Sequence, residues 1–280
     1  MPELPEVEVI RQFLDKKIVG QTISKIDILT PKSFIGNPKQ AKRVEGQKII
    51  GTSRIGKQLS LILENNLILL FHLKMTGQII YLPPLSRGGP ERGGVLKSTR
   101  LIFKLKETGF IFFNDQRKFG WVRIFTPSEL VESQSNLGPD IFSSEFTPSY
   151  LYRQLRSTSR PVKTVLLDQS KFAGIGNIYA NDALFLSGIH PQIPASKIPR
   201  SQTQKLHRHL LSIMHQSVVA GGSTAKDRGY LKPDGSTGSN QSHFRVYQQT
   251  GEPCLKCKTP IKYIKVGGRG TFYCPKCQRL

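Results

Sequence analysis

The chain has 280 residues, 38% of them hydrophobic, which is enough for ordinary buried cores and favours two domains over one. Its 41 Lys and Arg against 19 Asp and Glu leave a formal charge of +22, so a polyanion is the expected partner, and nucleic acid or an anionic membrane surface fits. The longest apolar runs, such as LILLF at 67–71, are far too short to span a bilayer, which excludes membrane insertion.

The opening MPELPEVEVI predicts a helix and places a proline, Pro2, in front of it. Apolar residues recur at helical spacings of three and four, at Val7, Ile10, Leu14 and Ile18. Pro5 fits the first turn of this helix, but Pro2 lies outside it. The acidic opening lacks the basic and apolar regions of a secretory signal, so a cytoplasmic location, in a bacterial cytosol or nucleoid, is expected.

Strand-like stretches follow at 48–63, 67–82 and 99–125, with turns at ENN 64–66 and at Thr108–Gly109, and they predict a β-sandwich. The segment 83–98 between the second and third stretches is rich in Gly, Pro and Arg and has no periodicity. We expect it to be a mobile surface loop.

Helical patterns replace the alternation beyond about residue 140, which predicts a second, helical domain. Its helices are expected at 147–156, 160–168, 176–188 and 201–220. In the motif GIGN the glycines allow tight turns, and the free N–H groups at the next helix start predict an anion site at Asn177, with an ordinary N-cap role as the alternative. The polar stretch 221–243 is expected to be a long flexible loop.

All four cysteines lie near the C-terminus in the pattern C-x2-C-x16-C-x2-C: Cys254, Cys257, Cys274 and Cys277. This spacing predicts one tetrahedral zinc ion, with two disulfides as the competing reading. The residues between the pairs predict two short strands joined by glycines around Arg269, so that a zinc-braced hairpin brings this arginine to a phosphate backbone. A purely structural zinc staple with solvated lysines explains the zinc but not the glycine-framed arginine.

Several motifs together strongly resemble formamidopyrimidine-DNA glycosylase, a family of bifunctional glycosylases and abasic-site lyases that act on oxidised purines. These motifs are MPELPEVE at the N-terminus, GKQL at 56–59, HLKMTG at 72–77, NDQRKFG at 114–120, LLDQSKFAGIGNIYANDAL, and the four-cysteine segment. They follow the family's order across nearly the whole chain. The opening resembles this branch more than the endonuclease VIII branch of the superfamily.

The resemblance implies an α+β fold: a β-sandwich with an N-terminal helix, a helix-two-turn-helix domain and a C-terminal zinc-finger hairpin. The expected domains are 1–140, which is catalytic, 141–243, which binds DNA and carries a lesion-capping loop, and 244–280, the zinc finger. It also implies one structural zinc, damaged double-stranded DNA as partner, no membrane association and a monomeric state.

The resemblance also explains Pro2, because removal of Met1 would leave a free secondary amine. That amine would attack the sugar C1′, expel the damaged base and form a cationic Schiff base that favours strand cleavage by β,δ-elimination. By the resemblance, Glu3 is the general acid/base. Lys57 matches the family's catalytic and phosphate-binding lysine.

The remaining expected site residues contact DNA. Met75, Arg117 and Phe119 match the set that fills the void left by a flipped nucleotide. Phosphate contacts are implied for His72, Asn177 and Arg269, which would then converge in a cleft between domains. The chain departs from the family pattern in 221–247, with Ser239 and Asn240 where aromatic residues are common and YQQ where YGR is common, and its loop at 86–99 is long.

Two other functions remain open at this point. An endonuclease VIII-like enzyme would share the amine chemistry but prefer oxidised pyrimidines. A noncatalytic zinc-containing DNA-binding protein would use the N-terminal motif only to start a helix.

Overall fold

The structure is a computed structural model that describes residues 2–83, 96–107, 109–224 and 229–280. Met1, Thr108 of the expected turn and most of the expected mobile loop lie outside these ranges. The chain forms two compact units, Met1–Ser135 with Ala220–Ser239, and Asn136–Val219 with Asn240–Leu280. Every helix in the described ranges is too short or too polar to cross a lipid bilayer. The expected functional boundaries at 140 and 243 stay predictions.

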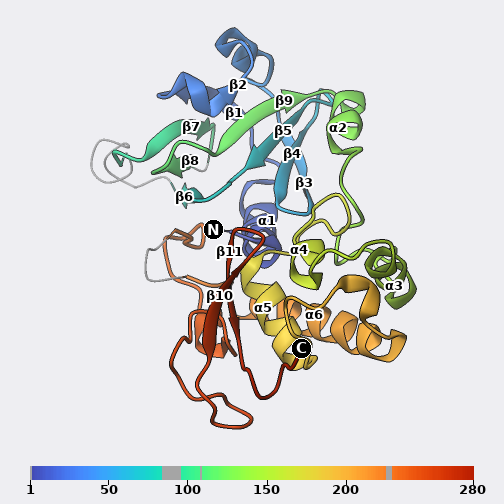
Figure 1. Ribbon diagram of the computed structural model, residues 1–280. Helices are drawn as coiled ribbons and strands as arrows, with labels where there is room; N and C mark the ends of the chain where they lie inside the picture. The colour runs from blue at the N-terminus through green and yellow to red at the C-terminus, as the bar shows by residue number, and fades with distance from the viewer. Residues whose placement is uncertain (1, 84–95, 108, 225–228) are drawn as a thin grey trace. The chain divides into compact units, whose positions relative to one another are not determined.

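The N-terminal unit is a β-sandwich, which confirms the predicted fold (Figure 1). One sheet has the strand order β1-β7-β8-β6 and the other β2-β9-β5-β4-β3. The pairs are antiparallel except for β2 with β9. The strands are β1 Ile23–Ile28, β2 Phe34–Ile35, β3 Ile49–Ile55, β4 Gln58–Leu63, β5 Ile68–His72, β6 Gly77–Leu82, β7 Thr99–Leu105, β8 Gly109–Asp115 and β9 Trp121–Phe125. Strands β1 and β2 were not predicted from the sequence, and neither was helix α2, Pro127–Gln134, which follows β9.

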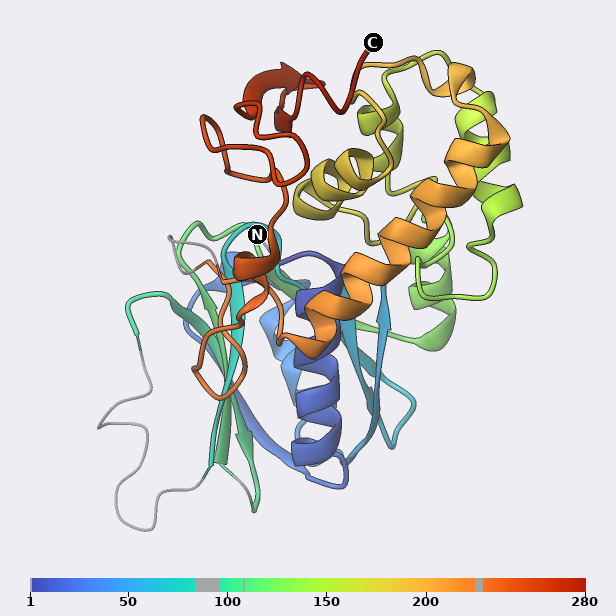
Figure 2. The ribbon, with the colours of Figure 1, turned by 90° about the horizontal axis from the view of Figure 1, so that it is seen from below.

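The predicted first helix is α1, Leu4–Ile18, which lies along the sandwich (Figure 2). Its four periodic apolar residues are fully buried and belong to the same hydrophobic core as residues of both sheets. Pro5 lies in the first turn as predicted, where its missing N–H costs nothing.

Helix α1 runs antiparallel to β3. Glu8 pairs with Arg54, and the hydroxyl of Thr52 donates to Asp15, so residue numbers rise along the helix as they fall along the strand. The start of α1 therefore lies at the end of the sandwich where β3 turns into β4.

The segment 220–239 belongs to the N-terminal unit, and its described residues, 220–224 and 229–239, form no helix or strand. We expected a long flexible loop at 221–243, and its described residues before Asn240 are irregular but anchored. The N–H of Ser223 donates to Glu6 Oε1 at 2.8 Å, and the N–H of Tyr81 on β6 donates to the carbonyl of Pro233 at 2.7 Å. Tyr230 is buried in the sandwich core.

The second unit is helical up to residue 219 and ends in a β-hairpin. Its elements are α3 Pro148–Arg156, α4 Val162–Leu166, α5 Asn177–Leu186, the 3-10 turn Ala195–Lys197, α6 Arg200–Val219, the 3-10 turn η5 Asn240–His243, β10 Lys262–Val266 and β11 Arg269–Tyr273. Helix α5 packs against both α6 and β11, so it joins the helical part to the finger. Helix α4 is shorter than the predicted 160–168, because Pro161 caps its start and residues from Asp168 onward form a turn.

Candidate functional site

Lys57 lies in the tight turn between β3 and β4, where Ile55 pairs with Gln58. The turn needs Gly56, whose φ of +57° lies in the left-handed region that side chains avoid. Glycine is therefore required directly before the lysine. The predicted lysine thus projects from the tip of a β-hairpin at the end of the sandwich where α1 begins.

His72, the last residue of β5, is the cross-strand partner of Gln58, which follows Lys57. Burial, with smaller contributions from the cations Lys74 and Lys57, lowers the pKa of His72 to about 3. The ring is therefore neutral at pH 7. Its Nδ1 accepts the N–H of Lys74 at 3.1 Å, so the proton of the neutral ring is on Nε2, which is available to donate to a phosphate oxygen.

The first residues of the chain are enclosed. Pro2 is buried, and Glu3 and Glu6 are each 1% exposed. Glu6 joins two segments through its carboxylate: Oε2 accepts the N–H of Glu3 at 2.9 Å, and Oε1 accepts the N–H of Ser223 at 2.8 Å. The start of α1 is therefore fixed both to its own first turn and to the segment 220–239.

Asp115 links the two turns that carry the expected void-filling residues. It is fully buried, and its carboxylate accepts the hydroxyl of Thr76 and, at 2.6 Å, the N–H of Gly120. The N–H of Arg117 lies 3.2 Å from the same carboxylate and 3.1 Å from Thr76 Oγ1. One buried anion thus holds the β5–β6 turn, residues 73–76, against the β8–β9 turn, residues 116–120.

The three expected void-filling residues are brought together by this link. Met75 lies in the first turn and Arg117 and Phe119 in the second. The guanidinium of Arg117 lies 5.0 Å from the centroid of the Phe119 ring, within cation–π range. Phe119 is 51% exposed, so it is a surface aromatic rather than a core residue. A large exposed aromatic beside a cation suits stacking on nucleic-acid bases.

In the second unit, Asn177 and Arg269 come together at the finger hairpin. The Asn177 side-chain amide donates to the carbonyl of Gly270 at 3.0 Å, directly after Arg269 at the start of β11. Gly176, not Asn177, is the N-cap of α5, so the alternative N-cap role is wrong. The hairpin tip is Gly267–Gly268, with Arg269 just beyond it. The convergence of His72 with this pair stays a prediction.

A buried lysine stabilises this junction. Lys163 on α4 is fully buried, and its ammonium donates to the carbonyl of Gly270 and to Thr271 Oγ1, each at 2.7 Å. Asn181 adds a third link, because its Oδ1 accepts the N–H of Phe272 at 2.8 Å. Helices α4 and α5 therefore hold the first residues of β11 in a fixed place.

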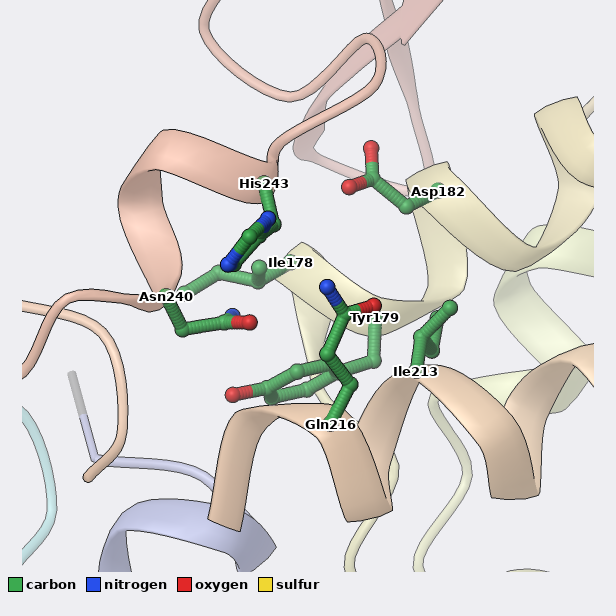
Figure 3. A pocket seen from close by; sticks show the side chains of 7 residues that line it. All are labelled: Ile178, Tyr179, Asp182, Ile213, Gln216, Asn240 and His243. Atoms are coloured by element: carbon green, nitrogen blue, oxygen red, sulfur yellow. The ribbon is translucent and has the colours of Figure 1, made fainter. Parts of the chain in front are cut away.

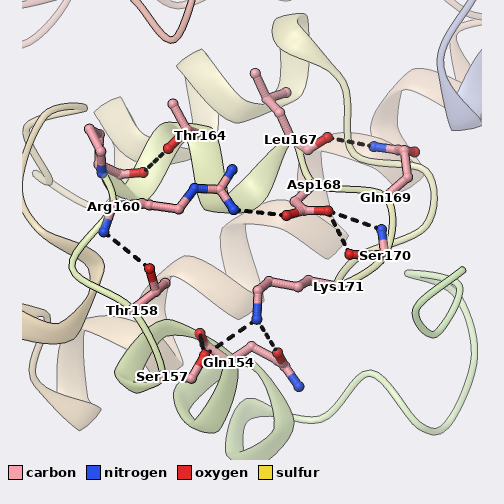
Figure 4. A network of polar contacts seen from close by, with 11 residues as sticks. Gln154, Ser157, Thr158, Arg160, Thr164, Leu167, Asp168, Gln169, Ser170 and Lys171 are labelled. Atoms are coloured by element: carbon pink, nitrogen blue, oxygen red, sulfur yellow. Dashed lines mark hydrogen bonds and ion pairs between the residues drawn. The ribbon is translucent and has the colours of Figure 1, made fainter. Parts of the chain in front are cut away.

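The turn between α4 and α5 is built by side chains that bond to nearby backbone (Figure 4). Gln169 Nε2 donates to the carbonyls of Leu167 and Ile175, and its Oε1 accepts the N–H of Gly174. Asp168 accepts from Ser170 and pairs with the guanidinium of Arg160 at 3.0 Å. These bonds set the path of the chain into the first turn of α5.

The segment that leads into the finger is fastened to α5 by Asp182. Its carboxylate accepts three consecutive backbone N–H groups, from Arg245, Val246 and Tyr247, at 3.0 to 3.1 Å. Burial raises the pKa of Asp182, and the three N–H groups oppose that rise. A cavity of about 10 Å³ beside it, lined partly by Gln216, Asn240 and His243, is the size of one water molecule (Figure 3).

The four cysteines form a metal site, as predicted. Their Sγ atoms all lie within 4.8 Å of one another. Cys254 and Cys277 are 3.9 Å apart at sulfur, and Cys257 and Cys274 are 3.4 Å apart. Four thiolates at the usual Zn–S distance of about 2.3 Å would lie about 3.8 Å apart, so the cluster fits one structural zinc ion. None of the four cysteines is paired in a disulfide, so neither disulfide of the competing reading is formed.

Four residues that organise the site were not predicted in these roles from the sequence: Glu6, Asp115, Lys163 and Asp182. Glu6 had a local signal, because it lies three residues after Glu3 in the arrangement of a capping box. Asp115 belongs to the motif NDQRKFG, but its partner Thr76 comes from another hairpin. The buried roles of Lys163 and Asp182 depend on contacts with the finger and carry no local pattern.

Three family models match the chain. The formamidopyrimidine-DNA glycosylase N-terminal domain matches residues 1–122, the H2TH domain of that family matches 137–228, and the zinc finger found in FPG and IleRS matches 251–280. Formamidopyrimidine-DNA glycosylase of Bacillus licheniformis is 39% identical over 286 residues, with both chains fully covered. The enzyme of Geobacillus kaustophilus is 37% identical, also with full coverage of both chains.

Solved structures agree with this assignment. A complex of Lactococcus lactis Fpg with DNA that contains an abasic site matches with a TM-score of 0.90 and 33% identity, over 100% of both chains. The MutM (Fpg) protein of Thermus thermophilus matches with a TM-score of 0.87 and 34% identity, over 99% of this chain and 98% of that one. The chain therefore belongs to the formamidopyrimidine-DNA glycosylase family, whose members are DNA glycosylases of base-excision repair.

Proposed function

We propose that the chain excises oxidised purines, namely 8-oxoguanine and formamidopyrimidines, from double-stranded DNA and then cleaves the strand at the resulting abasic site. The amine of Pro2, exposed by removal of Met1, is the nucleophile. Glu3 is the general acid/base and Lys57 assists at the sugar and its phosphate. The enzyme works as a monomer in the bacterial cytosol or nucleoid.

In the first step the Pro2 nitrogen forms a bond to C1′ of the deoxyribose, and the damaged base leaves with the C1′–N electron pair. The proton of the Pro2 nitrogen passes to the departing base, which restores the nitrogen lone pair. The nitrogen lone pair then expels O4′, which receives a proton from Glu3. Because Pro2 is a secondary amine, the product is a cationic iminium. Loss of a C2′ proton breaks the C3′–O bond, and a second elimination breaks the C5′–O bond.

DNA is held by groups on both units. His72 donates to a phosphate from Nε2 without carrying a charge, whereas Arg269 and Lys57 bind as cations. Met75, Arg117 and Phe119 fill the space of the extruded nucleotide, with Arg117 bonded to the orphaned cytosine. The zinc ion stabilises the finger that presents Arg269, and it takes no part in the chemistry.

One observation carries the proposal: the antiparallel run of α1 against β3 puts Pro2 and Glu3 at the end of the sandwich that bears the Lys57 turn. An amine, a carboxylate and an ammonium at one end of a β-sandwich suit imine chemistry on a sugar. The neutral imidazole of His72 adds a phosphate donor to this group.

Borohydride trapping tests the mechanism. With duplexes that carry 8-oxoguanine opposite cytosine, a covalent enzyme–DNA adduct is expected, and peptide mapping should locate it on Pro2. The intact mass of the purified protein should lack Met1. Binding without any adduct would support the noncatalytic reading, and an adduct on a lysine would refute the role of Pro2.

A lesion panel tests substrate choice. One Lactococcus lactis Fpg structure that matches with a TM-score of 0.88 and 33% identity is a complex with DNA that contains an oxidised pyrimidine. The panel therefore needs thymine glycol beside 8-oxoguanine and a formamidopyrimidine. Faster excision of both purine lesions supports the proposal, whereas a preference for thymine glycol would favour the endonuclease VIII-like alternative.

A further inference from the structure

Arg54 on β3 is an almost fully buried arginine that connects two parts of the N-terminal unit. Its side chain is 6% exposed. The Nε group donates to Glu8 Oε2 on α1 at 2.9 Å, and Nη1 donates to the carbonyl of Gly56 at 2.9 Å. A planar guanidinium can hold both acceptors in fixed directions.

The bond to Gly56 acts directly on Lys57. The Gly56 carbonyl belongs to the peptide group that ends at the Lys57 Cα, and a peptide group is planar. A bond that holds this oxygen therefore also holds the orientation of the Gly56–Lys57 peptide plane, and with it the Lys57 Cα from which the side chain extends. The turn gains from such a bond because Gly56, at φ +57°, has a wide choice of conformations.

The other end of the bridge is a strongly held carboxylate. Glu8 is 9% exposed and also accepts from Arg11 Nη2 at 2.7 Å and from Gln12 Nε2 at 3.0 Å. Burial raises the pKa of Glu8, but the hydrogen bonds from Arg11 and Arg54 outweigh it and pull the pKa below its usual value. Glu8 follows Glu3 in the same helix, about 7.5 Å along its axis.

We propose that Arg54, anchored on Glu8, is a positioning residue that sets the place of Lys57 relative to the start of α1. The proposal rests on the proposed function, in which Pro2 and Lys57 act on the same deoxyribose. Arg54 does not touch DNA in this role, and it acts only through the Lys57 turn.

The chain provides a matched control in Arg11. Arg11 and Arg54 both pair with Glu8, and the Arg54 guanidinium also bonds to the turn that holds Lys57. Arg11→Met therefore removes a cation from the same carboxylate and leaves the bond to Gly56 in place. In Arg54→Met, Glu8 keeps its bonds to Arg11 and Gln12, so the Glu8 carboxylate stays compensated.

The test compares single-turnover nicking of a duplex with an abasic site, at saturating enzyme so that affinity does not enter. Arg54→Met is expected to slow nicking roughly 10- to 100-fold, the range for a displacement of about 1 Å at a reacting group. Arg11→Met should stay within about twofold of the parent protein. Arg54→Lys keeps the charge but cannot bond both acceptors at once, so it should also be slow.

A double-mutant cycle separates positioning from a general structural effect. In a Lys57→Ala background, adding Arg54→Met should change the rate by less than about twofold, because the group that Arg54 positions is gone. An equal loss in both backgrounds, or equal rates for Arg54→Met and Arg11→Met, overturns the proposal. If melting curves show that Arg54→Met does not fold, Arg54→Lys takes its place in the same comparison. If the parent protein itself gives no borohydride adduct, the proposed function has failed instead.

Discussion

Replacing Asp115 is expected to loosen the two turns that carry Met75, Arg117 and Phe119. The carboxylate is fully buried and accepts hydrogen bonds from the Thr76 hydroxyl, from the N–H of Gly120 at 2.6 Å and, at the longer distance of 3.2 Å, from the N–H of Arg117. In Asp115→Ala the Thr76 hydroxyl and the N–H of Gly120 lose this acceptor, whereas the N–H of Arg117 keeps Thr76 Oγ1.

The size of the stability loss follows from the loss of two hydrogen bonds, those from Thr76 and Gly120. Hydrogen bonds to a charged group contribute about 1.5 to 3 kcal/mol each, so Asp115→Ala should lower the free energy of unfolding of the N-terminal unit by about 3 to 6 kcal/mol. Asp115→Asn keeps one acceptor oxygen, which can face the N–H of Gly120, and should lose about half as much. Asp27→Ala is the control, because this carboxylate is at the surface beside Lys25 and Lys104, and such pairs contribute about 0 to 1 kcal/mol.

Urea unfolding followed by tryptophan fluorescence measures the effect. Trp121 is the only tryptophan in the sequence and lies at the start of β9, directly after the turn that Asp115 holds, so the signal reports on the N-terminal unit. Affinity for a duplex with an abasic site should fall in the same order as stability. A loss for Asp115→Ala within about 1 kcal/mol of that for Asp27→Ala would refute the reasoning.

Three further predictions concern other parts of the molecule. The pKa of His72 lies at about 3, below the ordinary 6.5, so between these values the unfolded chain binds a proton that the folded chain does not. The stabilisation from the neutral ring is therefore complete above pH 6.5 and is lost as the pH falls towards 3. NMR should show no protonation of the His72 ring between pH 5 and 8. Protonation of the ring near pH 6.5 would contradict this prediction. Gly222→Ala would place a Cβ 2.8 Å from Tyr230, at a backbone φ of +80°, and should destabilise the protein by more than about 1 kcal/mol. Gly235→Ala is the control, because at φ +82° with nothing within 4 Å it adds backbone strain alone. Equal melting temperatures for the two variants would contradict the prediction. Chelation should release one zinc per chain and weaken DNA binding, both reversed by added zinc, and four freely reactive thiols in the purified protein would show that no metal is held.

Local patterns were sufficient for much of the fold. The helical spacing of Val7 to Ile18 predicted α1 and its buried face, and the cysteine spacing predicted the metal site and its hairpin, because each pattern is contained in one short segment. Strands β1 and β2 were not predicted, and for β2 the reason is that Phe34–Ile35 has too few residues to show any alternation.

The rest depended on contacts between distant segments. Glu6 and Ser223 are 217 positions apart, and no local pattern indicates that one accepts a hydrogen bond from the other. For the same reason we expected the glycine-rich segment 221–243 to be a flexible loop, although Ser223, Tyr230 and Pro233 are held on the sandwich. The resemblance supplied the site residues, while Asp115 and Arg54, which hold some of them in place, became visible only in three dimensions.

The N-terminal unit is assembled from two separate pieces of the chain, since residues 220–239 pack on a sandwich made from residues 1–135. A ribosome must therefore synthesise the whole helical region before the first unit can acquire its last segment. Until then Glu6 Oε1 lacks the N–H of Ser223, and the space that Tyr230 fills in the core stands open. A nascent chain stalled before residue 220 should thus carry an incompletely closed sandwich, and a fragment truncated at residue 135 should be less resistant to proteolysis than the same unit in the full-length chain.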